Sequence, residues 1–244
     1  MTKLKIFSVI MLLLFNIWGA NSTPIDSTKI NTKTFFKKSI LPASLIVVGS
    51  LISNSKFEKT LQTDLRNKIG NDYENKIDNY IVFAPIAEMY LADILGVKSK
   101  NHWFDQSKYL FISNLISSTI TYRLKVMTNK ERPSGGNNHS FPSGHTTLGF
   151  TNASVLYQEF KDSSPVLAYS GFAFATATGG FRMLNNKHYI SDVLVGAGIG
   201  ILVTELVYYI EPFKRFNPFK KSKNISFSPV FIEDKYGFYF SCKF

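Results

Sequence analysis

Long apolar stretches separated by short polar ones fill the middle of the chain. They are expected to form helices at roughly 79–97, 109–127, 145–160, 165–183 and 190–210. A shorter apolar stretch at 40–53 would add one more helix. Stretches of this length suit helices better than strands, so the pattern predicts an all-α bundle of five to six helices.

The residues before this core carry two other patterns. Residues 1–22 begin with lysines, continue with a short apolar core and end in small residues, which is typical of a cleaved export signal. The alternative is an uncleaved membrane anchor, although the apolar core is short for a span. Residues 23–39 are polar and basic and are expected to be loose, and residues 54–78 are expected to form an amphipathic helix or a surface loop. In this division residues 23–78 are an N-terminal polar and amphipathic region, and residues 79–211 are the helical core.

Residues 212–244 follow a third pattern. A basic segment comes first, and apolar and polar side chains then alternate from residue 225 to residue 244. The run Glu-Asp-Lys-Tyr-Gly at 233–237 interrupts this alternation where a hairpin loop would lie. The tail is therefore predicted to be a basic segment and a short β-hairpin. A single hairpin cannot close an outer-membrane barrel, so that class is not expected.

Composition narrows the choice of partners. The 244 residues carry a formal net charge of +11 and a pI of about 9.6. Such a basic excess suits phosphate esters, anionic lipid headgroups or nucleic acid. Nucleic acid is not expected, because the sequence shows neither zinc-finger spacing nor a ribbon of basic and aromatic residues. The single cysteine, Cys242, excludes an intrachain disulfide, and no cluster of Cys and His suggests structural zinc.

The helices are expected to be embedded in a membrane. Segments 165–181 and 190–210 are apolar, with Gly and Ala suited to close helix packing. Charged residues in 79–97 and hydroxyl-bearing residues in 109–127 make these two segments less apolar than a typical membrane span. A soluble periplasmic bundle is therefore the alternative.

Alternating helices place the loops 127–145 and 183–188 on one membrane face and the basic segment after residue 211 on the other. The positive-inside rule then predicts that the two loops lie in the periplasm. This topology requires that residues 40–53 do not fully span, as their length and Pro42 allow.

Three stretches combine cations, histidines and a carboxylate. The Pro-Ser-Gly-His run leads directly into a predicted helix, whose first N–H groups attract anions. Arginine can fork onto two phosphate oxygens, and lysine adds a point charge. The residues concerned are Lys125 and Arg132-Pro133 in the first stretch, Pro142-Ser143-Gly144-His145 in the second, and Arg182, His188 and Asp192 in the third. Together they are suited to bind a phosphate monoester.

The third stretch also offers a nucleophile. His188 and Asp192 are four residues apart, which on a helix places them on one face. A carboxylate that holds one ring nitrogen leaves the other free to attack, and His145 can protonate the leaving oxygen. This scheme requires no metal and no cofactor. His102 is expected to be a loop residue without a partner. His139 is expected to be an exposed loop histidine, and contact with the substrate is the alternative.

The three stretches resemble the signature of the type-2 phosphatidic acid phosphatase and vanadium haloperoxidase superfamily, over about residues 80–210. That signature reads Lys-x6-Arg-Pro, Pro-Ser-Gly-His and Ser-Arg-x5-His-x3-Asp, and Phe181 stands here in place of its Ser. The resemblance implies an all-helical core and metal-free catalysis. It implies that phosphate is bound by Lys125, Arg132, Ser143, Gly144 and Arg182, with His188 as nucleophile, Asp192 orienting it and His145 as general acid. We expect Phe181 to alter substrate fit or rate rather than abolish activity.

These expectations define a first hypothesis and three alternatives. The first is a cell-envelope phosphatase of lipid phosphates, such as phosphatidic acid, phosphatidylglycerol phosphate, a polyprenyl pyrophosphate or phosphorylated lipid A. The second is a soluble periplasmic acid phosphatase of broad specificity. The third is a vanadate-dependent haloperoxidase, for which the chain is short. The fourth is a membrane protein that binds phosphate without turnover, against which the complete set of His188, Asp192 and His145 argues.

Overall fold

The computed structural model describes residues 32–210, 225–232 and 235–242. The expected export signal at 1–22 and the basic segment at 212–224 lie outside these residues. The chain divides into a helical unit that ends at Tyr209 and a second unit that begins at Ile210.

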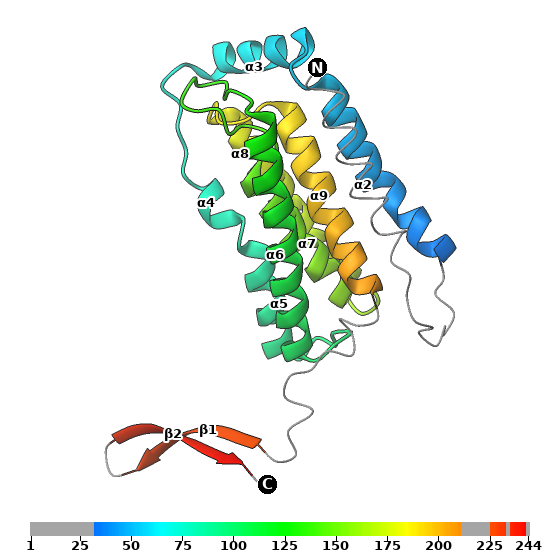
Figure 1. Ribbon diagram of the computed structural model, residues 1–244, viewed down its shortest axis with the longest axis vertical. Coiled ribbons are helices and arrows are strands. Elements are labelled where there is room, and N and C mark those ends of the chain that lie inside the picture. The colour runs from blue at the N-terminus through cyan, green and yellow to red at the C-terminus, as the bar shows by residue number, and fades with distance from the viewer. Residues whose placement is uncertain (1–31, 211–224, 233–234, 243–244) are drawn as a thin grey trace. The chain divides into compact units, whose positions relative to one another are not determined.

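The described part of the first unit consists of helices joined by short loops (Figure 1). They are α2 (Thr32–Ile52), α3 (Lys56–Ile69), α4 (Asp78–Ile81), α5 (Ala84–Ile94), α6 (Trp103–Thr128), α7 (Gly144–Phe160), α8 (Pro165–Leu184) and α9 (Ile190–Tyr209). The long helices run side by side, and α3 lies across one end of the bundle. The all-helical core expected from the pattern is confirmed.

Several boundaries differ from the expectation. Residues 32–39, expected to be loose, are the start of α2, so this helix is longer than the apolar stretch that marks it and continues through Pro42. Residues 79–97 form two helices rather than one, because Pro85 in the first turn of α5 begins a new helix. α6 begins six residues earlier than expected, at Trp103, where the His102 ring accepts a hydrogen bond from the Phe104 N–H at 3.4 Å.

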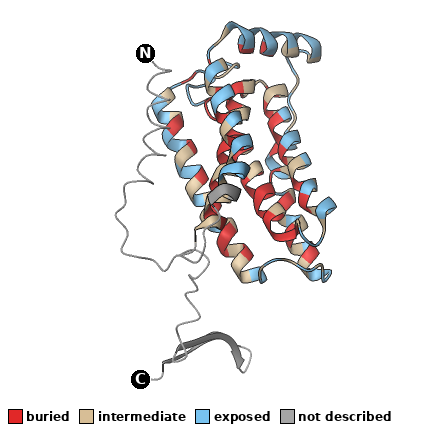
Figure 2. Ribbon diagram, turned by 90° about the vertical axis from the view of Figure 1, so that its right-hand side faces the viewer, coloured by how far each residue is buried: buried red, intermediate tan, exposed pale blue. Residues whose placement is uncertain are grey.

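The centre of the bundle is α7, which packs against α6, α8 and α9. Figure 2 shows the buried residues gathered on the inner sides of the helices. Two glycines of α9 allow α7 to approach very closely. A Cβ at Gly196 would lie 2.8 Å from the Ser143 carbonyl oxygen, and one at Gly200 would lie 2.7 Å from the Thr147 carbonyl oxygen. Any larger residue at these two positions would push the helices apart.

A row of hydrogen bonds between side chains joins α6 to α7 inside the bundle. The pairs are Asn114 to Asn152 at 2.9 Å, Thr151 to Ser117 at 3.0 Å and Thr121 to Thr147 at 3.1 Å. We call this row the α6–α7 polar seam. It explains why the expected helix at 109–127 is rich in hydroxyl groups: buried polar side chains must be paired, and here they pair across two helices.

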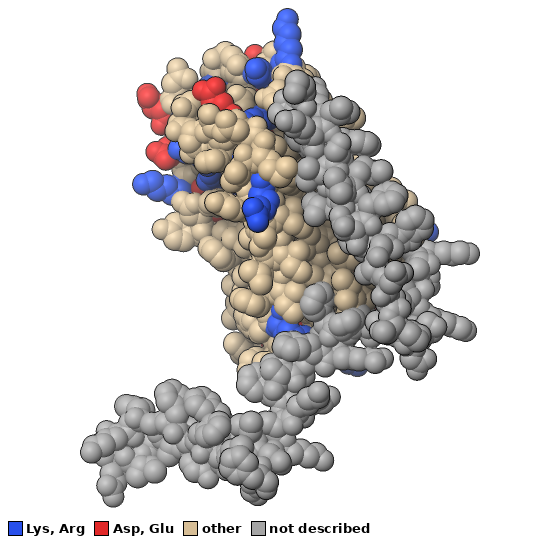
Figure 3. All heavy atoms as spheres, viewed as in Figure 1, with Lys and Arg blue, Asp and Glu red and all other residues tan. Residues whose placement is uncertain are grey.

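Two of the described helices are long and apolar enough to cross a membrane, within α2 (Phe35–Ile52, mean hydropathy 1.6) and α9 (Ile190–Tyr209, 1.9). Length and composition alone make this weak support for a span. α8, expected to be equally apolar, does not qualify, because Gly, Ser, Thr and Arg dilute it. On the face drawn in Figure 3, most charged side chains gather over the end that carries α3, and the sides of the long helices carry few.

The second unit contains the strands β1 (Ile225–Ile232) and β2 (Lys235–Cys242), which pair antiparallel. Ile232 pairs with Lys235, so residues 235–237, expected in the loop, belong to the strand pair.

Candidate active site

The three motif stretches meet at the end of the bundle where α6 and α8 end and α7 and α9 begin. The Ser143 N–H donates to the Asp192 carbonyl oxygen at 2.9 Å, which joins the second stretch to the third. The Lys125 ammonium donates to the His139 carbonyl oxygen at 2.8 Å, which ties the first stretch to the loop before the second. These contacts place the 127–145 loop beside the start of α9, and Pro133 and Asn186 line one pocket, so the 127–145 and 183–188 loops lie at the same end of the bundle.

His188 and Asp192 approach each other, but not as residues of one helix. α9 begins at Ile190, so His188 lies in the preceding loop. The approach comes instead from the Asp192 carboxylate, which accepts the Tyr189 N–H at 2.9 Å and so holds the loop against the helix. His188 Nδ1 lies 3.4 Å from Asp192 Oδ2, longer than an ordinary hydrogen bond.

The environment keeps His188 neutral. Its side chain is buried, and burial lowers the pKa of the imidazole to about 4, although the neighbouring Asp192 acts in the opposite direction. A neutral imidazole retains the lone pair that a nucleophile needs. Asp192 is held by further donors, which are Ser140 Oγ at 2.5 Å and Lys130 Nζ at 2.9 Å.

Three cations gather beside this pair. Burial and the charge of Arg132 lower the pKa of Lys125 to about 8, and burial and the charge of Arg182 lower the pKa of Arg132. The Arg182 guanidinium is anchored by Nη1, 2.7 Å from Asp78 Oδ2. The Nε atoms of Arg132 and Arg182 are buried without a hydrogen-bond partner among the described residues. A cluster of mutually repelling cations with unsatisfied donors is suited to an anion.

The Pro-Ser-Gly-His turn starts α7 beside these cations. Ser143 is the N-cap residue: its hydroxyl oxygen accepts the Thr146 N–H at 3.4 Å and the Thr146 hydroxyl at 2.9 Å. Its side chain is buried, so capping is the role that its contacts show. Gly144 lies against Lys125, because a Cβ on this residue would be 3.8 Å from Lys125 Cε.

His145 stands in the first turn of α7. Its Nε2 lies 2.9 Å from Asn79 Oδ1. Burial, followed by the charge of Arg182, lowers the pKa of its imidazole. A bound phosphate dianion would act in the opposite direction and favour the protonated ring that a general acid requires.

Sequence reasoning missed five residues that hold this site: Glu58, Asp78, Asn79, Lys130 and Ser140. Lys130 and Ser140 lie within or next to the recognised motifs, but nothing in their spacing marks them. Glu58 and Asp78 come from the segment expected to be an amphipathic helix or a surface loop, and Asn79 is the first residue of the expected core helix at 79–97. Phe181, by contrast, is half-buried, and nothing in the structure explains the aromatic ring at this position. His139 is exposed, and its contact with Lys125 uses only its backbone.

Among the described residues, no three side chains of His, Cys, Asp or Glu lie close enough together to hold a metal ion.

Residues 101–216 match the family model of the PAP2 superfamily. This match covers all three motif stretches, and it agrees with the class that the motifs resemble.

Individual relatives agree with this assignment. The chain is 29% identical over 177 residues to a lipid A 1-phosphatase of Porphyromonas gingivalis, with 71% of this chain and 39% of that protein covered. It is 34% identical over 71 residues to an acid phosphatase of Zymomonas mobilis, with 29% of this chain and 25% of that protein covered. The chain thus spans well under half the length of either relative.

Two crystal structures resemble the fold at low similarity. Aquifex aeolicus LpxE gives a TM-score of 0.43 at 19% identity, covering 77% of this chain and 100% of the other. The transmembrane PAP2 type phosphatidylglycerolphosphate phosphatase of Bacillus subtilis gives 0.44 at 15% identity, covering 88% and 99%.

Proposed function

We propose that the chain is a phosphatase of lipid phosphates that acts through a phosphohistidine on His188 and needs no metal ion. The observation that carries the proposal is the meeting of a neutral, buried His188 and its partner Asp192 with the cations Lys125, Arg132 and Arg182. This arrangement offers an anion site and a nucleophile at the same place. The match of residues 101–216 to the PAP2 superfamily model supports the same reaction class.

In the first step a phosphate monoester binds with its oxygens on Arg132, Arg182, Lys125 and the N–H groups at the start of α7. The lone pair of His188 Nε2 attacks phosphorus. The bond from phosphorus to the ester oxygen breaks with its electron pair, and His145 gives that oxygen a proton. The cations stabilise the charge on the phosphoryl group in transfer, and each such donor typically contributes roughly 10²–10³ in rate.

In the second step a water molecule attacks the phosphohistidine. His145, now neutral, takes a proton from the water, the phosphorus–nitrogen bond breaks, and inorganic phosphate leaves. Asp192 stabilises the positive charge that His188 carries while the phosphoryl group is attached to it. Both histidines return to their starting state.

A lipid substrate is supported by the surface of the bundle. Large apolar side chains are exposed along several helices, among them Leu51 on α2, Phe111 and Leu115 on α6, and Ile94 and Leu95 at the end of α5. Exposed apolar area of this extent is unusual for a soluble monomer. It favours helices that contact lipid, and a lipid tail could then stay in the bilayer while its headgroup enters the site. The names of the relatives, a lipid A phosphatase and an acid phosphatase, agree with phosphate ester hydrolysis.

We also propose that the site faces the periplasm. Three lysines gather at the end of the bundle opposite the site: burial lowers the pKa of the Lys161 ammonium, and the nearby charges of Lys38 and Lys100 lower it further. Positive charge favours the cytoplasmic side. The topology expected from the sequence required that residues 40–53 do not span the membrane. That requirement does not apply here, because α2 begins at this same basic end, so a crossing α2 also leaves the site in the periplasm. A crossing α2 does conflict with cleavage of an export signal at residues 20–22, so these two interpretations are alternatives.

The test is phosphate release by detergent-purified protein in EDTA, with phosphatidic acid and para-nitrophenyl phosphate compared. We expect release that prefers the lipid, vanishes in His188→Ala and persists in the control His102→Ala, which removes a histidine at the other end of α6. Alkaline quenching after a pulse of ³²P-labelled lipid should trap label on the wild type only. Equal or faster release from the soluble ester would instead identify an acid phosphatase. Activity that survives in His188→Ala would refute the proposed nucleophile.

A further inference from the structure

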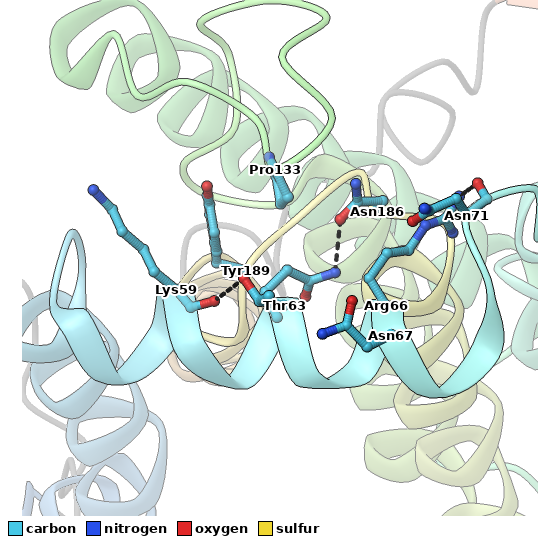
Figure 4. Close-up of a pocket in the computed structure, with 9 residues that line it drawn as sticks. Lys59, Thr63, Arg66, Asn67, Asn71, Pro133, Asn186 and Tyr189 are labelled. Atoms are coloured by element: carbon cyan, nitrogen blue, oxygen red, sulfur yellow. Dashed lines mark hydrogen bonds between the residues drawn. The ribbon is translucent and has the colours of Figure 1, made fainter.

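The helix α3 holds the loop that carries the nucleophile. Three residues at successive turns of α3, Glu58, Gln62 and Arg66, face the segment 183–191. Gln62 Nε2 donates to the Met183 carbonyl oxygen and to Asn186 Oδ1, both at 2.9 Å, and Arg66 Nη1 donates to the Leu184 carbonyl oxygen at 3.1 Å. Figure 4 shows α3 beside Asn186, Tyr189 and Pro133, which line with it a pocket of about 430 Å³.

The third of these residues, Glu58, reaches the catalytic carboxylate through one lysine. Lys130 Nζ lies 2.8 Å from Glu58 Oε1, 2.9 Å from Asp192 Oδ1 and 2.8 Å from Ser191 Oγ. Glu58 Oε2 also accepts the Ser191 hydroxyl. Glu58, Lys130 and Asp192 are all buried. An ammonium has three protons, so this geometry uses each of them on one partner.

Two buried carboxylates therefore share one buried ammonium. If Asp192 were the only partner of Lys130, the positive charge of Lys130 would cancel more of the negative potential that Asp192 exerts on His188. Glu58 balances Lys130 and leaves the Asp192 charge effective at the imidazole. The interaction is strong because solvent does not screen buried charges.

We propose that Glu58 is a positioning residue that tunes the nucleophile: by sharing Lys130 with Asp192 it maintains the basicity of His188. The inference rests on the proposed function, since it concerns the basicity of the same nucleophile, His188. The new element is that this basicity depends on α3, a helix outside the three motifs. The charges of Lys125 and Arg182 also act on His188, and both oppose its protonation.

The variant Glu58→Gln tests this, since it keeps the size and most hydrogen bonds but removes the charge. Its matched control is Asp64→Asn, which removes one charge from the exposed face of the same helix. With His188 less basic, kcat should fall roughly threefold or more while KM stays within about twofold, because nucleophilicity follows basicity. The acid limb of the kcat/KM profile should move to lower pH, by about half a unit.

The direction of that shift separates tuning from a purely structural role. A loosened site would let water reach His188, which would raise its pKa toward 6.5 and move the acid limb to higher pH. Glu58→Asp retains the charge and should keep the limb where the wild type has it, even if it unfolds at a lower temperature.

A limb that moves up in Glu58→Gln, or that matches Asp64→Asn, would overturn the inference. Failure of the proposed function would look different, because wild type and His188→Ala would then have equal rates.

Discussion

His145 Nε2 lies 2.9 Å from Asn79 Oδ1, so the residue proposed as general acid is oriented by a short helix that precedes all three motifs. An amide oxygen accepts the Nε2 proton and leaves Nδ1 as the nitrogen that gives and takes the catalytic proton.

Replacing Asn79 by Asp should keep a larger fraction of His145 protonated at a given pH. The added carboxylate favours the protonated ring, so the pKa of His145, lowered by burial in the wild type, should rise. The basic limb of the kcat/KM profile should then move to higher pH. Asn79→Ala should instead lower kcat by roughly tenfold with little change in that limb, because the ring loses its orientation. Identical profiles for the two variants would show that Asn79 does not act on His145.

The sequence predicts the bundle well, and the reason is physical. Apolar stretches of helical length can be recognised one by one, and alternating helices must bring the 127–145 and 183–188 loops to the same end. The support from α3 and α4 could not be predicted in this way. Glu58 meets Ser191 across 133 positions, and the polar face of α3 has the same pattern whether it covers a loop or faces water. Only the three-dimensional structure distinguishes these cases.

Removing the charge of Asp78 should make the thermal stability of the protein depend on bound phosphate. Asp78 is buried against Arg182, and breaking a buried ion pair on one side typically costs about 3–5 kcal/mol. In Asp78→Asn the unpaired guanidinium should lower the melting temperature, and inorganic phosphate or vanadate should restore more of it than they add to the wild type. Thermal unfolding in detergent, with and without the anion at 10–100 times its apparent Kd, measures this; binding at that excess stabilises the folded protein by roughly 1.4–2.7 kcal/mol. If phosphate raised both melting temperatures equally, Arg182 would not bind the anion.

A methyl group at Gly196 should displace the Pro-Ser-Gly-His turn of the site, because Gly196 of α9 packs directly against it. The methyl carbon would lie 2.8 Å from the Ser143 carbonyl oxygen, a backbone atom that cannot move without shifting the Pro-Ser-Gly-His turn. We expect Gly196→Ala to lose about 1–3 kcal/mol of stability and most activity. Gly180→Ala is the matched control, because a Cβ there meets nothing within 4 Å. It should be neutral or slightly stabilising, as Ala is the better helix former. Equal effects of the two changes would contradict the close packing of α7 and α9.

The proposed orientation can be read by labelling in intact cells. In a Cys242→Ser background, Asp72→Cys probes the loop at the site end, and Asp162→Cys probes the turn between α7 and α8 at the opposite end; both aspartates are exposed. A membrane-impermeant maleimide should label position 72 and not position 162 until the membrane is opened. The reverse pattern would place the site in the cytoplasm, and labelling of both would indicate a soluble periplasmic domain. The mass of the purified chain tells whether an export signal has been removed.

The α6–α7 polar seam has a consequence for how the site is assembled. Apolar helices in lipid can slide past one another at little cost, because every apolar register looks much alike. The three hydrogen-bonded pairs from Asn114 to Thr121 fit together in one register only. A slip of α6 by one turn, about 5.4 Å, would break all of them and carry Lys125 away from Gly144. The seam thus fixes the position of α6 along the bundle axis, and with it the level at which Lys125 at the end of α6 lies beside the start of α7.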